Sequence, residues 1–174
     1  GQLLDTASIG AEAGLLPAAR LQLASGRFIS DDDGYDTLVV VGSGIAQALA
    51  PGGQSLRLGD KIRIDNYLYT VVGTLKETLR NPLLPFDVNQ SLIVPFKANR
   101  RMMFYNGSVS NILIRVGNES DPIAVLSDVS AYLTSRGTSS QVQGASQLIE
   151  GMQKQNQLFT WMLSGLGAIS LLVG

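Results

Sequence analysis

The stretch KIRIDNYLYTVVGTL, residues 61–75, decides the fold class. Ile62 and Ile64 alternate with charged residues, and a second alternating run follows the pair Asp65 and Asn66. Alternation is the period of a half-buried strand, and Asp and Asn both tolerate the positive φ angles of a tight turn. The stretch therefore predicts a β-hairpin, and it is the clearest local pattern in the chain.

Apolar runs on either side of the hairpin predict further strands. TLVVV, residues 37–41, has no alternation and is rich in β-branched residues, as expected for a strand that is buried on both faces. QSLIV, residues 90–94, and NILIRV, residues 111–116, are interpreted as two more strands. A short strand is also expected over residues 3–10, followed by alternation over residues 21–29.

Helices are expected between these strands. Asp121 and Pro122 predict the start of a helix, because Asp is a good N-cap and Pro fits the first helical position. Its apolar residues share one face, and Gly137 is expected to end it. Those apolar residues are Ile123, Leu126, Val129 and Leu133. Shorter helices are expected over 15–20, over 44–50 with Ser43 as cap, from Pro95 to about Met103, and from Ser146 onward. The pattern predicts an α+β fold with a mixed sheet.

The composition excludes several classes of function. The 174 residues include 13 Lys+Arg and 14 Asp+Glu, which give a net charge of −1, and contain neither His nor Cys. No Ser-His-Asp or Cys-His nucleophile, Cys/His zinc site or disulfide is therefore possible. Nothing suggests the basic face that nucleic acids require. No carboxylate pair has an acid–base context, so we predict no catalytic, cofactor-binding or metal-binding residue and expect a non-catalytic protein.

Two motifs resemble known ligand sites, and for both a structural role is favoured. Gly42-Ser43-Gly44 follows a predicted strand, as in a dinucleotide-binding turn, but Gln47 stands where the third glycine belongs. A structural strand-to-helix turn is the better interpretation. The aspartates at positions 31, 32, 33 and 36 resemble a loose cation loop, but their spacing departs from the EF-hand and no bidentate Glu follows. A solvated turn is favoured there.

Two further segments are candidates for protein contacts. The loop TLRNPLLPFDV, residues 78–88, carries four large apolar side chains around two prolines. A loop of this composition either packs on its own domain or binds a partner, and the sequence leaves both open. Residues 100–105, RRMMFY, have the composition of an interface anchor, although a helix with one buried and one charged face is favoured.

The two ends of the chain suggest a membrane protein. LFTWMLSGLGAISLLVG, residues 158–174, has no charged residue and is close to the length of a membrane span. A buried helix and a shortened transmembrane helix both account for it. The first residues lack the basic region of a signal peptide, so we expect the chain to be a piece of a larger protein.

Six segments, taken in order, resemble the periplasmic core domain of MacB-type ABC transporter permeases, in the FtsX superfamily. That family has a Gly-Arg-Phe turn, a VVVxG strand before a short helix, a GxxIxI hairpin that ends in VVG, and an IVP strand. The resemblance covers about residues 7–174, and the order and spacing of the segments make it specific. The segments are SGRF (25–28), TLVVVGSGIAQAL (37–49), LGDKIRIDNYLYTVVGTL (58–75), LIVPF (92–96), NILIRV (111–116) and AISLLVG (168–174).

The resemblance implies a porter-like part, which is a mixed sheet with packed helices, and a mostly β sabre-like part. It assigns residues 1–27 to entry strands, 28–89 to the sabre-like part and 90–145 to the second half of the porter-like part. Residues 146–174 would be a long stalk helix that enters a truncated transmembrane helix. The first half of the porter-like part would be missing, so we expect a sheet edge or apolar face that partner chains or a domain swap cover.

The resemblance also implies a function. The domain would lie on the periplasmic side of the bacterial inner membrane, held by its C-terminal helix, and would couple ATP-driven conformational change to export or other work. Its partners would be a second permease copy, paired along the stalk, an ABC ATPase domain or subunit and, in an efflux system, an adaptor and an outer-membrane channel. No cofactor is implied. The alternatives are a lipoprotein-releasing or cell-division-type permease of the same superfamily, or a soluble non-catalytic binding module.

Overall fold

The computed structural model describes residues 7–49, 56–64, 66–102, 109–117 and 120–137. The chain divides into two units, Gly1–Arg115 and Val116–Gly174, and each is described by itself. The elements of the first unit are β1 (Ala7–Ala11), α1 (Leu15–Ala18), β2 (Leu23–Gly26), the 3-10 turn η1 (Asp31–Asp33), β3 (Leu38–Val41), α2 (Ser43–Ala48), β4 (Lys61–Ile64), β5 (Tyr67–Leu75), the 3-10 turn η3 (Val88–Gln90), β6 (Ser91–Pro95) and α3 (Phe96–Met102). In the second unit, α4 (Pro122–Ser135) is described.

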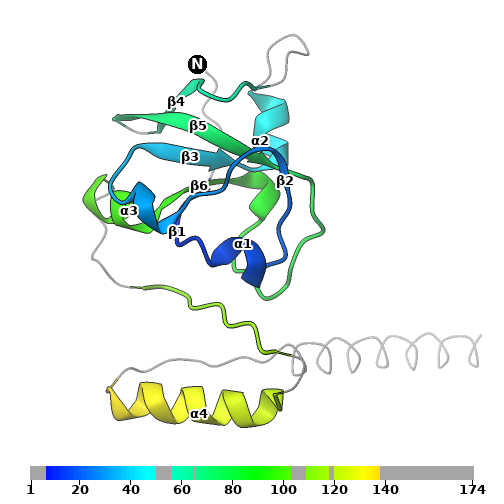
Figure 1. Ribbon diagram of the computed structural model, residues 1–174, viewed down its shortest axis with the longest axis vertical. Helices are drawn as coiled ribbons and strands as arrows, with labels where there is room; N and C mark the ends of the chain where they lie inside the picture. The colour runs from blue at the N-terminus through cyan, green and yellow to red at the C-terminus, as the bar shows by residue number, and fades with distance from the viewer. Residues whose placement is uncertain (1–6, 50–55, 65, 103–108, 118–119, 138–174) are drawn as a thin grey trace, which may run out of the picture. The chain divides into compact units, whose positions relative to one another are not determined.

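The nine-residue strand β5 pairs with three strands of a six-stranded mixed sheet, whose strands β4, β5, β3, β6 and β1 lie one below another in Figure 1. On one edge β5 pairs with β3, which runs parallel to it. On the other edge its first half pairs with β4 and its second half with β2, both antiparallel. Thr70 therefore lies between Leu38 and Lys61. One strand thus joins three others.

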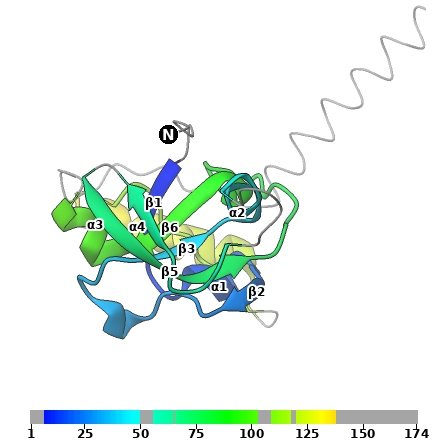
Figure 2. The ribbon, with the colours of Figure 1, turned by 90° about the horizontal axis from the view of Figure 1, so that it is seen from above.

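The sheet continues from β3 to β6 and ends at β1. β6 runs antiparallel to β3 and parallel to β1, with an unbroken register from Ala7↔Ser91 to Ala11↔Pro95. Figure 2 shows β1 beside β6 in the view from above. The mixture of parallel and antiparallel neighbours, with short helices around the sheet, is the predicted α+β fold.

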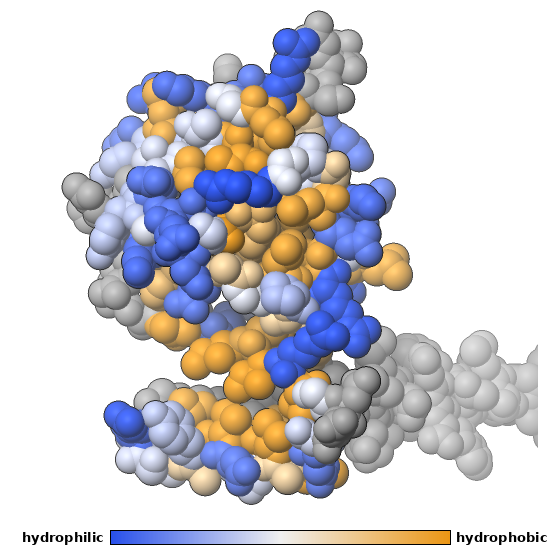
Figure 3. Space-filling model, viewed as in Figure 1, coloured by the Kyte–Doolittle hydropathy of each residue, from blue (hydrophilic) through white to orange (hydrophobic). Residues whose placement is uncertain are grey.

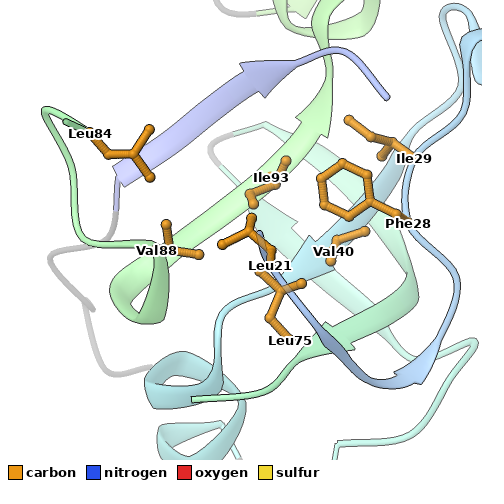
Figure 4. Packing of buried hydrophobic residues seen from close by; sticks show 8 residues of the cluster. All are labelled: Leu21, Phe28, Ile29, Val40, Leu75, Leu84, Val88 and Ile93. Atoms are coloured by element: carbon orange, nitrogen blue, oxygen red, sulfur yellow. The ribbon is translucent and has the colours of Figure 1, made fainter. Parts of the chain in front are cut away.

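Both faces of the sheet are covered by apolar residues, so its central strands need no alternation. Val40 faces one hydrophobic cluster while Val39 and Val41 face the other. The side chains of the first cluster point toward one another in Figure 4 and come from strands, loops and the η3 turn. The first cluster is Leu21, Phe28, Ile29, Val40, Leu75, Leu84, Val88 and Ile93. The second is Val39, Val41, Ile45, Ile64, Tyr69, Val71, Leu92 and Val94.

Most predicted elements of the first unit are confirmed. The hairpin forms as β4 and β5, and the runs at 37–41 and 90–94 become β3 and β6. The helical turn near Leu15 and the helix after Pro95 are also present. Asp65 of the predicted turn lies outside the described residues.

The strand predicted at Asn111–Val116 is wrong, because the structure assigns no strand to these residues. Alternation shows that a segment is able to form a strand, but a strand also needs a neighbouring strand to pair with. None of the described strands pairs with residues 111–116. Leu113 packs on the first cluster, whereas Ile112 and Ile114 are exposed. Arg115 Nη1 donates to Pro17 O at 3.1 Å, which ties the segment to the short helix α1.

The helix α4 starts and ends as predicted. The Asp121 side chain accepts a hydrogen bond from Ile123 N at 3.0 Å, Pro122 occupies the first turn, and Gly137 has a φ of 71° after the last turn. The predicted face is only partly covered: Leu126, Val129 and Leu133 are half-buried, whereas Ile123 is 74% exposed.

The predicted internal boundaries do not coincide with the division seen in the structure. The divisions at 27/28 and 89/90 fall within one sheet, because β1 and β6 pair with each other and share that sheet with β3 and β5. The observed division falls between Arg115 and Val116. The names sabre-like and porter-like for these parts stay predictions.

The tail and its stalk lie outside the described residues. In the portion that is described, no helix has the length and apolar character needed to cross a membrane.

The first cluster is expected to carry much of the stability of this unit. Ile93 is fully buried, so Ile93→Ala should lower the free energy of unfolding by about 2–5 kcal/mol through lost burial and a cavity. The matched control is Ile112→Ala at an exposed site, which should change it by less than about 0.5 kcal/mol. Urea unfolding followed by circular dichroism measures both. Equal effects of the two changes would contradict the assigned core.

Candidate partner-binding loop

The segment between β5 and η3 packs on the core and also presents apolar side chains to solvent. Leu84 is buried in the first cluster, and Phe86 is half-buried against it. Leu79, in contrast, is 92% exposed, and Leu83 is also exposed. The two roles left open by the sequence therefore belong to different residues of one loop. Leu84 anchors the loop, and Leu79 is available to a partner.

The side chain of Asn89 closes this loop at its base. Thr78 N donates to Asn89 Oδ1 at 3.0 Å, and Asn89 Nδ2 donates to Thr78 O at 2.7 Å. One amide thus satisfies the backbone N–H and C=O of Thr78, as a neighbouring strand would. The bonds fix the backbone immediately before Leu79.

Asn89 is itself held from two sides. Ser43 Oγ donates to Asn89 Oδ1 at 2.9 Å, and Asn89 N donates to Asp87 Oδ1 at 2.9 Å. The predicted cap role of Ser43 is wrong: Gly42 occupies the cap position, and Ser43 is the first residue of α2. The role of Asn89 is not predictable from the sequence, since its partners Thr78 and Ser43 lie 11 and 46 residues away and leave no local pattern.

The Gly42-Ser43-Gly44 turn is shaped by its contact with the η3 turn, to which Asn89 belongs. A Cβ atom at Gly42 would overlap the carbonyl oxygen of Val88, and one at Gly44 would overlap the Gln90 side chain. Both glycines are therefore explained by the close approach of η3 to the start of α2. This favours the structural interpretation of the motif over the nucleotide-binding one.

A second turn orients the middle of the loop. Asn81 accepts hydrogen bonds from Leu83 N, through its side chain, and from Leu84 N, through its carbonyl oxygen, both at 3.0 Å. The turn leaves Leu83 exposed and directs Leu84 to the core. Side-chain hydrogen bonds and one buried anchor thus hold the loop, so its exposed leucines are presented on an ordered backbone. A loop whose backbone is already ordered loses little conformational freedom on binding, which suits protein recognition.

The acidic turn at residues 31–36 is a structural ion pair with exposed neighbours. Arg27 donates to both carboxylate oxygens of Asp33, at 2.8 and 2.7 Å, and Ser30 N donates to the same carboxylate at 2.7 Å. The hydrogen bond from Arg27 is the main reason that the pKa of Asp33 is lowered, although burial opposes it. The same hydrogen bond raises the pKa of Arg27.

The prediction of a solvated turn holds for the other three aspartates, which are exposed, and fails for Asp33, which is buried. Within the ranges that the structure describes, no three His, Cys, Asp or Glu residues are grouped to hold a metal ion. Arg27 belongs to the SGRF segment, so this ion pair gives that segment a structural role. The side chains of residues 100–105 lie outside the described part of the chain.

The family model of the MacB-like periplasmic core domain matches residues 1–132, which is most of the chain. The chain belongs to this family. The resemblance inferred from the sequence segments is thereby confirmed.

Members with assigned names are distant relatives. The macrolide export ATP-binding/permease protein MacB of Marinobacter nauticus is 28% identical over 174 residues, which cover 97% of this chain and 27% of the relative. MacB of Azoarcus sp. is 28% identical over 156 residues, which cover 87% of this chain and 23% of the relative. The chain thus spans about a quarter of the length of these relatives.

A solved structure agrees with the fold. The periplasmic region of MacB from Actinobacillus actinomycetemcomitans matches with a TM-score of 0.65 at 13% identity, covering 84% of this chain and 64% of that one. At this identity the likeness shows a shared architecture. The mixed sheet is therefore the family's fold.

The Arg27–Asp33 pair predicts a pH dependence with a definite sign. The folded-state pKa of Asp33 is lowered, so its stabilisation is present above the unfolded pKa of about 4 and is lost as the pH falls through the folded value. Asp33→Asn should therefore reduce the free energy of unfolding at pH 7, by about 2 kcal/mol, and its deficit against wild type should shrink in acid. Urea unfolding from pH 7 to pH 3 measures this deficit. The exposed neighbour Asp32→Asn is the control, and a Asp33→Asn deficit that grows in acid would contradict the assignment.

Removal of the amide at position 89 should loosen the loop without unfolding the sheet. Asn89→Ala should raise hydrogen exchange across residues 78–88 at least about tenfold, because the Thr78 backbone loses both partners. Asn89→Asp keeps the acceptor for Thr78 N but loses the donor to Thr78 O, so an intermediate rise is expected. Mass spectrometry after deuterium labelling measures the exchange. Unchanged exchange in Asn89→Ala would show that other contacts hold the loop.

Proposed function

We propose that this chain is the periplasmic domain of an ABC transporter permease of the bacterial inner membrane, and that it passes ATP-driven conformational change to export outside the membrane. The family match over residues 1–132 carries the proposal. The names of the relatives support macrolides as the exported class.

In this proposal the domain does mechanical work and performs no chemistry. The ATPase would be another domain or subunit, as the printed name of the relatives, ATP-binding/permease protein, suggests. The chain's lack of His and Cys is consistent with a non-catalytic part. Residues 146–174 would form the stalk and enter the membrane, and a second permease copy would pair along that stalk.

We propose the loop of residues 78–88 as the surface that binds a partner in the periplasm, such as an adaptor linked to an outer-membrane channel. Three observations support this role. Leu79 is almost fully exposed, Asn89 fixes the backbone on which it stands, and Leu84 anchors the same loop in the core. An exposed leucine alone is common on protein surfaces. Leu79 differs because hydrogen bonds already fix the backbone on which it stands, so less conformational freedom is lost when a partner binds.

A charge at Leu79 should impair export while leaving the fold intact. In the complete gene product, Leu79→Glu should lower macrolide resistance of the host at least about fourfold, because a carboxylate cannot enter an apolar partner site without a large desolvation cost. Leu68→Glu, at another exposed leucine on the hairpin, is the matched control and should leave resistance unchanged.

The thermal midpoint of the two variants should match that of the wild-type chain. Equal resistance in Leu79→Glu and wild type would remove the loop from the proposal. No resistance even for the wild-type gene product would argue against macrolide export itself.

A further inference from the structure

Arg20 has a backbone conformation that is unusual for an arginine. Its φ is 55°, and in the described part of the chain no other residue except glycine has a positive φ. Leu21 N donates to Leu16 O at 2.9 Å, and Arg20 N donates to Pro17 O at 3.3 Å. These two bonds make Arg20 the C′ residue of a Schellman motif that ends α1. Glycine is the usual residue at this position, because an L side chain is strained there.

Contacts within the fold do not explain why an arginine stands at this strained position. Arg20 is exposed, and its guanidinium makes no hydrogen bond or ion pair with any other residue that the structure describes. Backbone strain that persists without a local benefit indicates a function for the side chain. The function of Arg20 is therefore sought outside its own domain.

The segment that contains Arg20 leaves the sheet beside the loop of residues 78–88. Lys76 N donates to Gln22 O at 2.8 Å, at the end of the β2–β5 pair where that loop begins. In an antiparallel pair, the chain before one strand and the chain after the other lie at the same end. α1 and the loop also pack on the same first cluster, below the sheet in Figure 1. Arg20 is therefore a neighbour of the start of the loop.

Exposed cations surround this loop. Residues 15–22 and 76–88 contain three exposed cations and one exposed anion. The cations are Arg20, Lys76 and Arg80, and the anion is Glu77. The second anion, Asp87, is half-buried and accepts a backbone hydrogen bond. Arg115 is exposed too and is bonded to α1, so it adds a fourth cation. This surface is positive although the whole chain has a net charge of −1.

We propose that these four cations, the cationic rim, select the partner of the loop, and that the partner is a protein segment in which acidic side chains flank an apolar socket for Leu79. An apolar anchor at the centre of an interface gives affinity, whereas opposite charges around it steer association and fix the orientation of the partner. The rim and Leu79 supply these two parts. The strain at Arg20 is then explained by the charge that this residue adds to the rim.

An anionic membrane surface would also attract cations, but the loop does not have the surface that membrane insertion requires. Insertion at a membrane interface needs a broad apolar face. In this loop Leu79 is 92% exposed, whereas Leu83 is 37% exposed and Leu84 is buried in the core. A single projecting leucine among cations fits a socket on a protein better than it fits a bilayer.

This inference rests on the proposed function in taking the loop as the partner site, and it adds the chemistry of the partner. It does not depend on which compound is exported. If the rim has no such role, the effect of Leu79→Glu on resistance is unchanged, so the failure of this inference and the failure of the proposed function can be distinguished.

Photo-cross-linking in cells that carry the complete gene product tests the partner's chemistry. A photoreactive benzoylphenylalanine in place of Leu79 should capture another protein, and mass spectrometry should place the cross-link in a segment rich in Asp or Glu. Arg20→Glu combined with Arg80→Glu should lower the yield of this adduct at least about fivefold, because like charges then face each other. Arg57→Glu, at an exposed site before β4, is the matched control and should leave the yield unchanged.

Several results would overturn the proposal. They are the absence of any adduct, an adduct with a lipid or with a second copy of this chain, a captured segment without acidic residues, and an unchanged yield in the double variant. Because the adduct forms whatever the cargo is, each of these results is independent of the resistance assay.

Arg20 allows a second test, in which stability and binding should change in opposite directions. Arg20→Gly relieves the backbone strain and should raise the thermal midpoint of the 174-residue chain by about 2–4 °C. The same change should lower the cross-link yield at least about twofold, because one charge of the rim is lost. Arg20→Lys keeps both the charge and the strain, so its midpoint and yield should match those of the wild type. An Arg20→Gly variant that is less stable than the wild type, or that cross-links equally well, overturns the role of Arg20.

Discussion

The pairing of β5 with three strands is the constraint on which the first unit depends. Its first half holds β4 by a two-residue connection, and its second half holds β2, which lies some 50 residues earlier in the chain. β3 pairs with the opposite edge of β5 between Thr70 and Thr74 and leads the sheet on to β6 and β1. Tyr69 and Val71 of β5 are buried in the second cluster and Leu75 is buried in the first, so this one strand contributes to the clusters on both faces of the sheet. The two hydrophobic clusters form on the two faces that this arrangement creates.

Polar side chains then fasten the segments that the sheet does not reach. Asn89 joins the loop, the start of α2 and the η3 turn, and Asp33 joins the SGRF segment to the turn before β3. Each such hydrogen bond adds only modestly to the free energy of unfolding, but a buried polar group that loses its partner is costly, so removing either partner should be destabilising. Under the proposed function the domain would transmit motion, and it would then have to keep its shape under load. These side-chain hydrogen bonds restrict the motion of loops and turns that have no strand neighbours.

The surface is differentiated in the same terms. Hydrophobic side chains reach the solvent among hydrophilic ones on the face shown in Figure 3. Scattered apolar residues need no explanation, but their support distinguishes them. Leu79 stands on a hydrogen-bonded loop, and β1 is an edge without the bulge or the cations that guard β2 and β4. Partner contacts are best sought where hydrogen bonds hold an exposed apolar side chain in place, or where an edge strand has neither a bulge nor charged residues.

The sequence by itself determined the elements whose cause is local. The hairpin follows from alternation around a turn pair, β3 from a β-branched apolar run, and α4 from its Asp-Pro start and Gly end. The order of segments also identified the family. Local spacing has this power because side-chain direction repeats every two residues in a strand and every 3.6 in a helix. Only the tertiary structure decided which strands pair, and that Ser43 bonds to Asn89 instead of capping its helix. It also decided that Asp33 is buried while its neighbours are exposed, and that residues 111–116 form no strand despite their alternation. The strand pairings and the bond from Ser43 to Asn89 join groups tens of residues apart, and residues 111–116 lack a neighbouring strand, which spacing cannot reveal. The partners of Asp33 are only three and six residues away, but its burial depends on how the fold packs around this turn. A hydrogen bond or a ladder exists only where the fold brings both partners together.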